Sequence, residues 1–478
     1  MSVTHSANGR SGTGPDPDFR LPVPEGEPCR QARGWLWLGL ISLVFAGLFA
    51  VLLVLSRTPF VQDIIPFVDF FHTALVVHVD LSVLVWFVAF AGVFWSLHSS
   101  GRFTGWGWSA LGLSGAGTAV MVLAPFAGTG NPLMSNYIPV LQQPVFLIGL
   151  VLFGAGFALL ALRALLFAPP VGMWISGTGA LRFGLNTAVV AAVLALLAFA
   201  WSFLAVPSSL QSTAYYELLF WGGGHVLQFT HTHLMLVAWL WLASASGAAP
   251  RIGPRVVVFL FAWGLLAVFI TPLIYLAYDV GSVQHRLLFT WQMQFGGSLA
   301  ALLIGAAVLL GLVTGGRAPR QARAERATLW ASLVLFTSGG IIGFLIQGSN
   351  VTIPAHYHGS IVGVTLAFMG IAYHLLPRFG YEAPSQRLAV WQAGVYGGGQ
   401  MLHILGLAWS GGYGVQRKTA GAAQGLDSIE RIVSMGMMGL GGLISIIGGV
   451  LFLVVVFGAI YRSRRGPAAA RQVSGAVE

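Results

Sequence analysis

Two histidines stand two residues apart near the start of an apolar stretch that is long enough to cross a membrane. The stretch, TIPAHYHGSIVGVTLAFMGIAYHLL, runs from Thr352 to Leu376 and contains His356 and His358. Coordinating and ionisable side chains are costly in hydrocarbon and usually mark function there. Residues two apart on a helix point about 200° away from each other. One helix can therefore hold two separate metal centres, one on each flank.

The composition is that of a polytopic membrane protein. The chain has 478 residues, of which 56% are hydrophobic and only 8% are charged, which is unusual for a soluble domain. The one cysteine, Cys29, excludes an internal disulfide, a CxxCH site for covalent haem attachment and a CxxC metal site. The placement of the net charge of +10 indicates membrane topology rather than nucleic-acid binding.

Twelve apolar stretches are long enough to cross a bilayer. They cover residues 34–55, 71–97, 107–126, 141–166, 183–206, 216–243, 254–279, 286–313, 328–347, 354–376, 388–410 and 432–461. The sequence thus predicts an all-α polytopic membrane protein with about twelve transmembrane helices. Residues 33–462 are expected to form one transmembrane domain. Residues 1–32 are expected to be a disordered N-terminal tail, and residues 463–478 a C-terminal tail.

The distribution of basic residues predicts the orientation of the helices. If the N-terminus is cytoplasmic, 19 of the 24 Lys and Arg residues fall inside, and the exceptions are Arg57, Arg286, Arg417, Lys418 and Arg431. Cytoplasmic loops of membrane proteins carry such an excess of basic residues. Both termini and both tails are therefore predicted to be cytoplasmic. We expect an integral protein of the bacterial inner membrane.

This topology places four histidines in the outer half of the membrane. They are His78, His225, His356 and His358, and neutral imidazole is a common ligand of haem iron. A haem with two axial histidines needs a ligand from a second helix, which His78 can supply. His225 can approach the open face of the other haem. Gln228 shares the helix face of His225 and can contact a ligand or a water.

These residues resemble subunit I of the haem–copper oxidase superfamily, which includes cytochrome c oxidase and the large subunit of nitric oxide reductase. That family has a twelve-helix core, one histidine on its second helix and an HxH pair on its tenth. The resemblance implies that His78 and His358 are the axial ligands of a low-spin haem, and that His356 is the proximal ligand of a high-spin haem. The segment GHVLQF at 224–229 resembles the sixth-helix segment whose histidine, here His225, binds the active-site copper.

The resemblance also covers a segment that holds haem propionates in the family. It is carried by LHILGL at 402–407 and VQRK at 415–418. By resemblance, His403, Arg417 and Lys418 bind a haem here.

Two departures from the family pattern concern the second active-site metal. The position of a common oxidase tyrosine is Phe229, and the seventh apolar stretch has no pair of adjacent histidines. A copper or non-haem iron usually needs about three or four ligands. Besides His225, the candidates at a suitable height are Tyr275, Tyr278, Asp279 and the loop residue His285.

The resemblance implies the catalytic subunit of a respiratory terminal reductase, in which a low-spin haem passes electrons to a high-spin haem and metal site that reduces a diatomic gas. Splitting oxygen needs four electrons, and the family's tyrosine supplies one. Reducing two NO to N₂O needs only two, so the departures favour nitric oxide. Reduction of oxygen to water, with Tyr275 or Tyr278 as the missing tyrosine, is the alternative. A non-catalytic haem-bearing membrane scaffold is a further alternative.

The sequence says less about the electron-donating partner and the proton route. Electrons are expected from a companion subunit or a cytochrome c, or from a quinol, because the chain has no motif for covalent haem. The intramembrane acids, Asp80, Glu217 and Asp279, all lie toward the outer side. No acidic chain leads inward from the cytoplasm, and His374 is interpreted as an ordinary structural histidine.

Overall fold

The computed structural model describes residues 18–55, 70–128, 130–172, 175–417 and 425–474, and most of these residues are helical. The longer helices are α1 (Glu27–Leu55), α2 (Phe70–Val79), α3 (Trp86–Leu97), α4 (Thr104–Leu123), α5 (Pro144–Phe167), α6 (Gly177–Ala205), α7 (Ser212–Ala245), α8 (Pro254–Val268), α9 (Thr271–Ala277), α10 (Val283–Trp291), α11 (Ser298–Thr314), α12 (Arg323–Phe344), α13 (Thr352–Leu375), α14 (Gln386–Gly412) and α15 (Ile429–Ser474). Helices suit a bilayer because they satisfy every backbone polar group internally.

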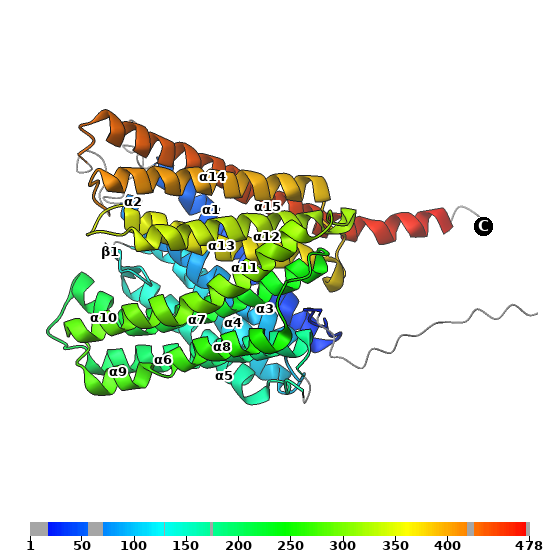
Figure 1. Cartoon of the computed structure of the whole chain (residues 1–478), viewed down its shortest axis with the longest axis horizontal. Helices are drawn as coiled ribbons and strands as arrows, with labels where there is room; N and C mark the ends of the chain where they lie inside the picture. The colour runs from blue at the N-terminus through cyan, green and yellow to red at the C-terminus, as the bar shows by residue number, and fades with distance from the viewer. Residues whose placement is uncertain (1–17, 56–69, 129, 173–174, 418–424, 475–478) are drawn as a thin grey trace, which may run out of the picture.

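The helices lie side by side in one bundle (Figure 1). Within the described ranges, eleven helical spans are long and apolar enough to cross a membrane. α14 is 27 residues long but less apolar, and it completes the expected set of about twelve. α7 and α13 are central, since 83% of the most apolar window of each is buried, against 39–50% in most other spans. The all-α polytopic fold predicted from the sequence is confirmed.

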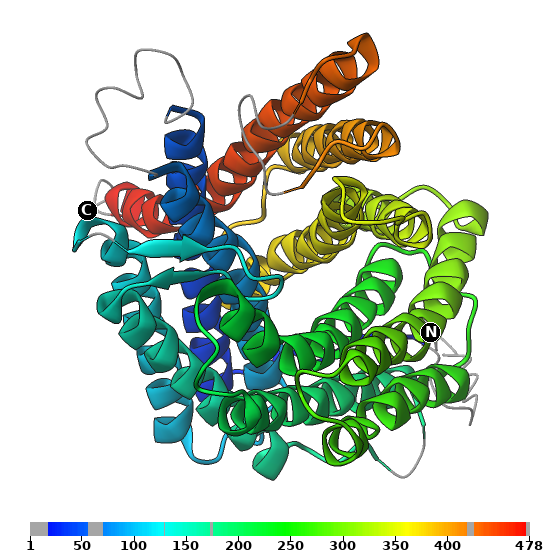
Figure 2. The same ribbon diagram turned by 90° about the vertical axis from the view of Figure 1, so that its left-hand side faces the viewer.

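The bundle has two distinct ends (Figure 1). At the end that we call the hairpin end, β1 (Asn131–Leu133) pairs antiparallel with β2 (Val140–Gln142), and Figure 2 looks onto these strands. At the opposite end, which we call the terminal end, lie the start of α1 and the last turns of α15. Both histidines of the HxH pair lie in the first two turns of α13, at the hairpin end.

The helical domain is longer at both ends than the expected boundaries of 33 and 462. α1 begins at Glu27, and the preceding residues 18–26 pack on the bundle. In that segment Phe19 is buried, and its backbone N–H donates to the Ser244 hydroxyl at 3.2 Å. α15 continues to Ser474 as a helix. The remainder of the expected tails, residues 1–17 and 475–478, lies outside the described residues.

Two interruptions in long helices position residues of interest. A π-helical turn, η2 (Asp80–Val85), joins α2 to α3 directly after His78. Between α8 and α9 the helix breaks, and Pro272 stands in the first turn of α9, where a missing backbone N–H is tolerated. At the start of α10, the Ser282 hydroxyl accepts the N–H of His285 at 3.1 Å. His285, expected in a loop, therefore stands in the first turn of a helix.

Candidate haem and metal site

Five of the histidines share one arrangement that prepares them as metal ligands. In each, Nδ1 lies within hydrogen-bond distance of a backbone carbonyl oxygen. The pairs are His78 with Ala46 (2.8 Å), His225 with Trp221 (2.7 Å), His356 with Gly339 (2.8 Å), His358 with Pro354 (2.9 Å) and His403 with Met438 (2.9 Å). A proton donated from Nδ1 to a carbonyl leaves the lone pair on Nε2, which is the form of imidazole that binds metals.

The HxH pair faces opposite flanks of α13, as the spacing predicts. His356 faces α12, where a Cβ atom on Gly343 would lie 2.7 Å from its Nδ1. His358 faces α14, and its ring centroid lies 4.9 Å from that of His403. The two imidazoles therefore belong to different surroundings.

One cluster of histidines forms around His358. His78 on α2 and His403 on α14 are its titratable neighbours, so three helices contribute to this cluster. Among the described residues, no partner is found for Nε2 of these three histidines or of His356. The arrangement fits axial ligation of haem iron, because several imidazoles present open Nε2 atoms inside the bundle.

Arg417 lies near this cluster at the hairpin end. Its guanidinium donates to the Ser349 hydroxyl at 3.2 Å and to the Asn136 side-chain oxygen at 3.3 Å. It also acts electrostatically on Tyr357, which stands between the two histidines of the HxH pair. Lys418, expected beside it, lies outside the described residues.

A second cluster forms around His225 on α7 and His285 on α10. Both side chains are buried, and the Phe289 ring contacts both imidazoles, with centroid distances of 6.2 Å and 4.9 Å respectively. Neither ring nitrogen of His285 has a hydrogen-bond partner among the described residues. A buried polar group without a partner is costly, so these nitrogens suggest a ligand-binding position.

The partner of His225 is a tyrosine that the sequence did not indicate. The Tyr137 hydroxyl lies 2.9 Å from Nε2 of His225, and Tyr137 belongs to the loop between β1 and β2. Burial raises the pKa of the Tyr137 phenol, and the carboxylate of Glu217 raises it further, whereas a hydrogen bond with Gln228 lowers it. The phenol is therefore protonated and donates to His225, and Gln228 contacts this phenol.

The glycine run at 222–224 allows aromatic side chains to reach His225. Added Cβ atoms on these three glycines would lie 2.3 Å from Tyr275, 2.3 Å from Phe199 and 2.2 Å from Tyr137. No side chain fits at such distances, so each glycine lets one ring pack directly on the backbone of α7. The glycine run was the one sequence signal that could have pointed to Tyr137.

The other residues expected at the second metal have different surroundings. The Tyr275 ring lies 4.9 Å from that of His285, but its hydroxyl hydrogen-bonds to Ser202 (2.8 Å) and to the Ala198 carbonyl (3.0 Å). The structure does not bring Tyr278 and Asp279 to the cluster. α9 ends at Ala277, and both side chains that follow are exposed. A role for these two residues at the second metal stays a prediction.

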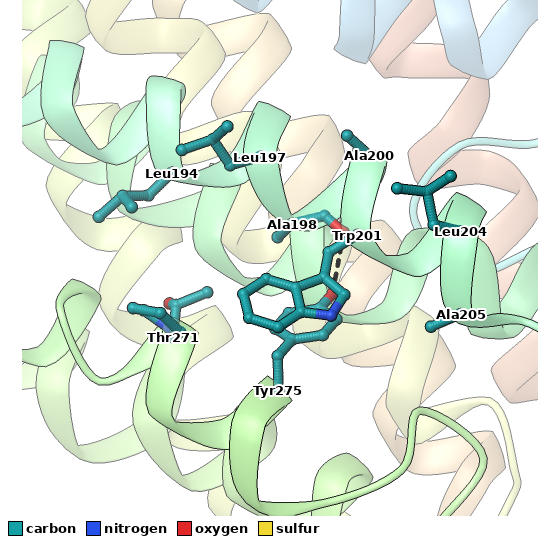
Figure 3. A pocket seen from close by; sticks show the side chains of 10 residues that line it. Leu194, Leu197, Ala198, Ala200, Trp201, Leu204, Ala205, Thr271 and Tyr275 are labelled. Atoms are coloured by element: carbon teal, nitrogen blue, oxygen red, sulfur yellow. Dashed lines mark hydrogen bonds between the residues drawn. The ribbon is translucent and has the colours of Figure 1, made fainter.

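An apolar pocket of about 540 Å³ lies between α6 and α9 (Figure 3). It is lined by leucine and alanine side chains of α6, together with Trp201, Thr271, Pro272 and Tyr275. Leu197 and Leu204 on its rim are exposed, so the pocket opens at the outer face of the bundle. Its Tyr275 wall separates it from His285.

The two clusters fit their expected cofactors unequally. The cluster around His358 and the separate His356 offer the imidazoles that two haems require. The cluster around His225 offers two imidazoles and a phenol. Among the described residues, no group of three or more His, Cys, Asp or Glu side chains could hold a metal ion. The donor set therefore does not fit a copper site made of three histidines.

Comparisons with known proteins agree with this architecture. The family model described as cytochrome c and quinol oxidase polypeptide I matches residues 30–451. The chain is 30% identical to the protein RP382 of Rickettsia prowazekii (strain Madrid E), over 89% of this chain and 94% of that protein. It is 29% identical to a protein of Aquifex aeolicus (strain VF5), over 73% and 85% of the two chains.

The fold is similar to that of a solved haem–copper terminal oxidase dimer. The TM-score is 0.67 at 17% sequence identity, and the match covers 92% of this chain and 84% of that chain. The family match spans most of the apolar helices and both histidine clusters. The chain therefore belongs to the family of cytochrome c and quinol oxidase polypeptide I, the haem–copper oxidase subunit I family.

Proposed function

We propose that this chain is the catalytic subunit of a respiratory terminal reductase that reduces nitric oxide to nitrous oxide. Membership of the family makes it an oxidoreductase of a membrane-bound electron-transport chain. The substrate is the proposed part. The observation that carries it is the donor set around His225, in which two imidazoles and one phenol stand where three histidines would favour copper.

We assign His78 and His358 to the low-spin haem and His356 to the high-spin haem. The carbonyl contacts of their Nδ1 atoms support this assignment, because they orient each ring and direct Nε2 away from the helix backbone. Bound haems would supply one-electron transfer between the two sites. His403, whose ring lies 4.9 Å from that of His358, and Arg417 would hold the edge or propionates of this haem.

We assign His225 and His285 to the second metal. Two histidines with open positions resemble the two-histidine part of a non-haem iron site, which a carboxylate usually completes. Converting two NO to N₂O and water consumes two electrons and two protons, so no electron is needed from a protein radical. The two-imidazole donor set therefore supports nitric oxide as the substrate.

Oxygen is the second candidate substrate, and one observation favours it. The protonated phenol of Tyr137 is hydrogen-bonded to His225. It could replace the tyrosine that is common in the oxidases, whose position in this chain is occupied by Phe229. Converting O₂ to two waters consumes four electrons and four protons, and a phenol can supply one electron and one proton. The two substrates are separated by experiment below.

The pocket beside α6 offers an entry for either gas. Small apolar gases concentrate in the hydrocarbon of a bilayer, and this pocket opens at the outer face of the bundle with largely apolar walls. The electron donor is a companion subunit, a cytochrome c or a quinol. The bacterial sources of the two relatives support a location in a bacterial inner membrane.

The test is gas consumption by the purified, haem-loaded protein with an artificial electron donor. NO should be consumed faster than O₂. His225→Ala should abolish consumption while both haem spectra remain, because His225 binds neither haem. His98→Gln is the matched control, since His98 is bonded to Asn186 at 3.2 Å, remote from both clusters. Rapid O₂ consumption with negligible loss of NO would replace the proposal by the oxygen alternative.

A further inference from the structure

A buried acid–base pair lies at the terminal end, far from both histidine clusters. Nδ1 of His374 lies 3.5 Å from a carboxylate oxygen of Glu325, and the side chains are only 6% and 8% exposed. Glu325 stands in the first turn of α12 and His374 in the last turn of α13. The second carboxylate oxygen of Glu325 is buried and has no partner among the described residues.

Two arginines and a tryptophan lie near the pair. Arg378 donates to the backbone carbonyl of His374 at 2.7 Å, and Arg20 acts electrostatically on both His374 and Arg378. Arg20 is itself paired with Asp18 at 2.8 Å. On the α7 side, the Trp241 ring contacts His374 with a centroid distance of 5.3 Å.

Stability does not explain this pair well. Burying two ionisable groups carries a desolvation cost that their attraction often fails to exceed. Within membrane helices such groups are rare and usually belong to ion or proton pathways. The unpartnered carboxylate oxygen adds a further cost, which a bridging water at the site would remove.

Polar groups continue from this pair along the interface of α12 and α13. Glu325, Thr328 and Ser332 share one face of α12, at spacings of three and four residues. Both hydroxyls are buried, and the Ser332 hydroxyl donates to the Gly363 carbonyl at 2.6 Å. A Cβ atom on Gly370 would lie 2.4 Å from the Thr328 hydroxyl, so the two helices meet closely at this polar seam.

The same interface ends at the high-spin haem ligand. On α12, the Gly339 carbonyl accepts the hydrogen bond from Nδ1 of His356. At about 1.5 Å of rise per residue, Glu325 lies roughly 21 Å from Gly339 along the helix. The hydroxyls divide the first half of this length into steps of about 5 Å, which one bridging water can span.

We propose that Glu325 and His374 form the entry point through which protons from the solution at the terminal end enter the bundle. They pass along the seam of Thr328 and Ser332 toward the gas-reducing site. The inference rests on the proposed function, since reduction of NO or of O₂ consumes protons. It differs from the expectation that no acidic chain leads inward from the cytoplasm. Glu325 was overlooked because it lies among the arginines of 317–326.

The test compares three variants of the full-length, haem-loaded protein. Glu325→Gln keeps the size of the side chain but cannot carry a proton. Glu325→Asp keeps the acid but shortens the side chain. If the pair with His374 were purely structural, Glu325→Asp would therefore disturb it at least as much as Glu325→Gln does. Glu382→Gln is the matched control, because Glu382 is an exposed acid after α13 near the same end. Thermal melting and haem spectra report folding.

We expect Glu325→Gln to lower gas turnover at least tenfold, because a positioned proton-transfer group typically contributes about 10²–10⁴-fold. Glu325→Asp should keep most of the turnover, and Glu382→Gln all of it. Electron entry, measured as the rate of haem reduction without gas, should stay unchanged. Turnover of Glu325→Gln within twofold of wild type, or Glu325→Asp no better than Glu325→Gln, would overturn the proposal.

A second readout separates this inference from the proposed function. Proton uptake on chemical reduction of the haems, followed with a pH-indicating dye in weakly buffered solution, needs no gas substrate. Slower uptake in Glu325→Gln supports the entry point even if neither gas is consumed. Thr328→Val, which removes a hydroxyl and keeps its shape, should slow uptake as well. If Glu325→Gln and Thr328→Val both take up protons at the wild-type rate, the proposed route is wrong. This holds even if the protein consumes neither gas.

Discussion

The Tyr137 hydroxyl lies 2.9 Å from Nε2 of His225, although 88 residues separate the two in the chain. Nδ1 of His225 is held by the Trp221 carbonyl at 2.7 Å, so both ring nitrogens are engaged. A metal ion at Nε2 would take the place of the phenolic proton. If the second metal binds His225 as we propose, it displaces the hydrogen bond from Tyr137.

Tyr137→Phe distinguishes the two candidate substrates. The variant keeps the ring that packs on Gly224 and removes only the hydroxyl, so both haems should remain bound. For a nitric oxide reductase we expect NO turnover within about threefold of wild type, because no phenolic electron is used. Gas consumption with an artificial donor measures the turnover of the variant. A tenfold or larger loss of turnover would indicate that the phenol takes part in the reaction, and would favour oxygen as the substrate.

Gly224→Ala should displace the hairpin loop from α7. An added Cβ atom would lie 2.2 Å from the Tyr137 ring, and forcing extra volume into a packed site costs about 1–3 kcal/mol. We expect a lower melting temperature in detergent. Gly154→Ala in α5 is the control, because nothing lies within 4 Å of the added atom there, so it should not destabilise. Equal melting temperatures for the two variants would contradict the packing argument.

Local pattern predicts much of this structure. The apolar stretches predict the positions of the transmembrane helices, because the length of a hydrophobic segment decides whether it can cross a bilayer. The spacing of His356 and His358 predicts that their side chains face opposite flanks of the helix, since helix geometry fixes the angle between residues two apart.

Other features depend on packing between distant segments. Tyr137 reaches His225 through a hairpin whose position only the folded bundle defines. Tyr278 and Asp279 were expected at the metal site, but the helix break at Pro272 and the end of α9 leave them exposed. Glu325 is buried against His374 of α13, which composition alone does not reveal.

The axial ligands of the low-spin haem can be identified by single substitutions. His78→Ala and His358→Ala should each remove the bis-histidine optical and EPR signature, because each deletes an axial ligand. His403→Ala should keep it, since His403 is assigned to the edge of the haem. Loss of the signature in His403→Ala with retention in His78→Ala would move the axial ligand from α2 to α14. His72, nearer the start of α2, is the residue that could replace His78.

Arg417 and Lys418 should raise the potential of the low-spin haem. Arg417 acts on Tyr357 beside His358, and a positive charge near a haem stabilises its reduced form. The paired change Arg417→Gln and Lys418→Gln should lower the midpoint potential in a redox titration. Arg431→Gln is the control, because Arg431 is already paired with Asp427 at 2.7 Å. An unchanged potential in the paired variant would assign Arg417 a purely structural role.

His285 gives the sharpest test of the second metal. Both of its ring nitrogens are buried without a partner among the described residues, which costs about 1–3 kcal/mol unless a ligand satisfies them. In protein stripped of the second metal by a chelator, His285→Phe should therefore raise the melting temperature, because an apolar ring removes that cost. In loaded protein it should lower the non-haem metal content and the turnover by at least tenfold, while both haem spectra remain. Metal analysis and melting curves on matched samples check both effects. Unchanged metal content in His285→Phe would remove His285 from the site and leave His225 as its one assigned imidazole.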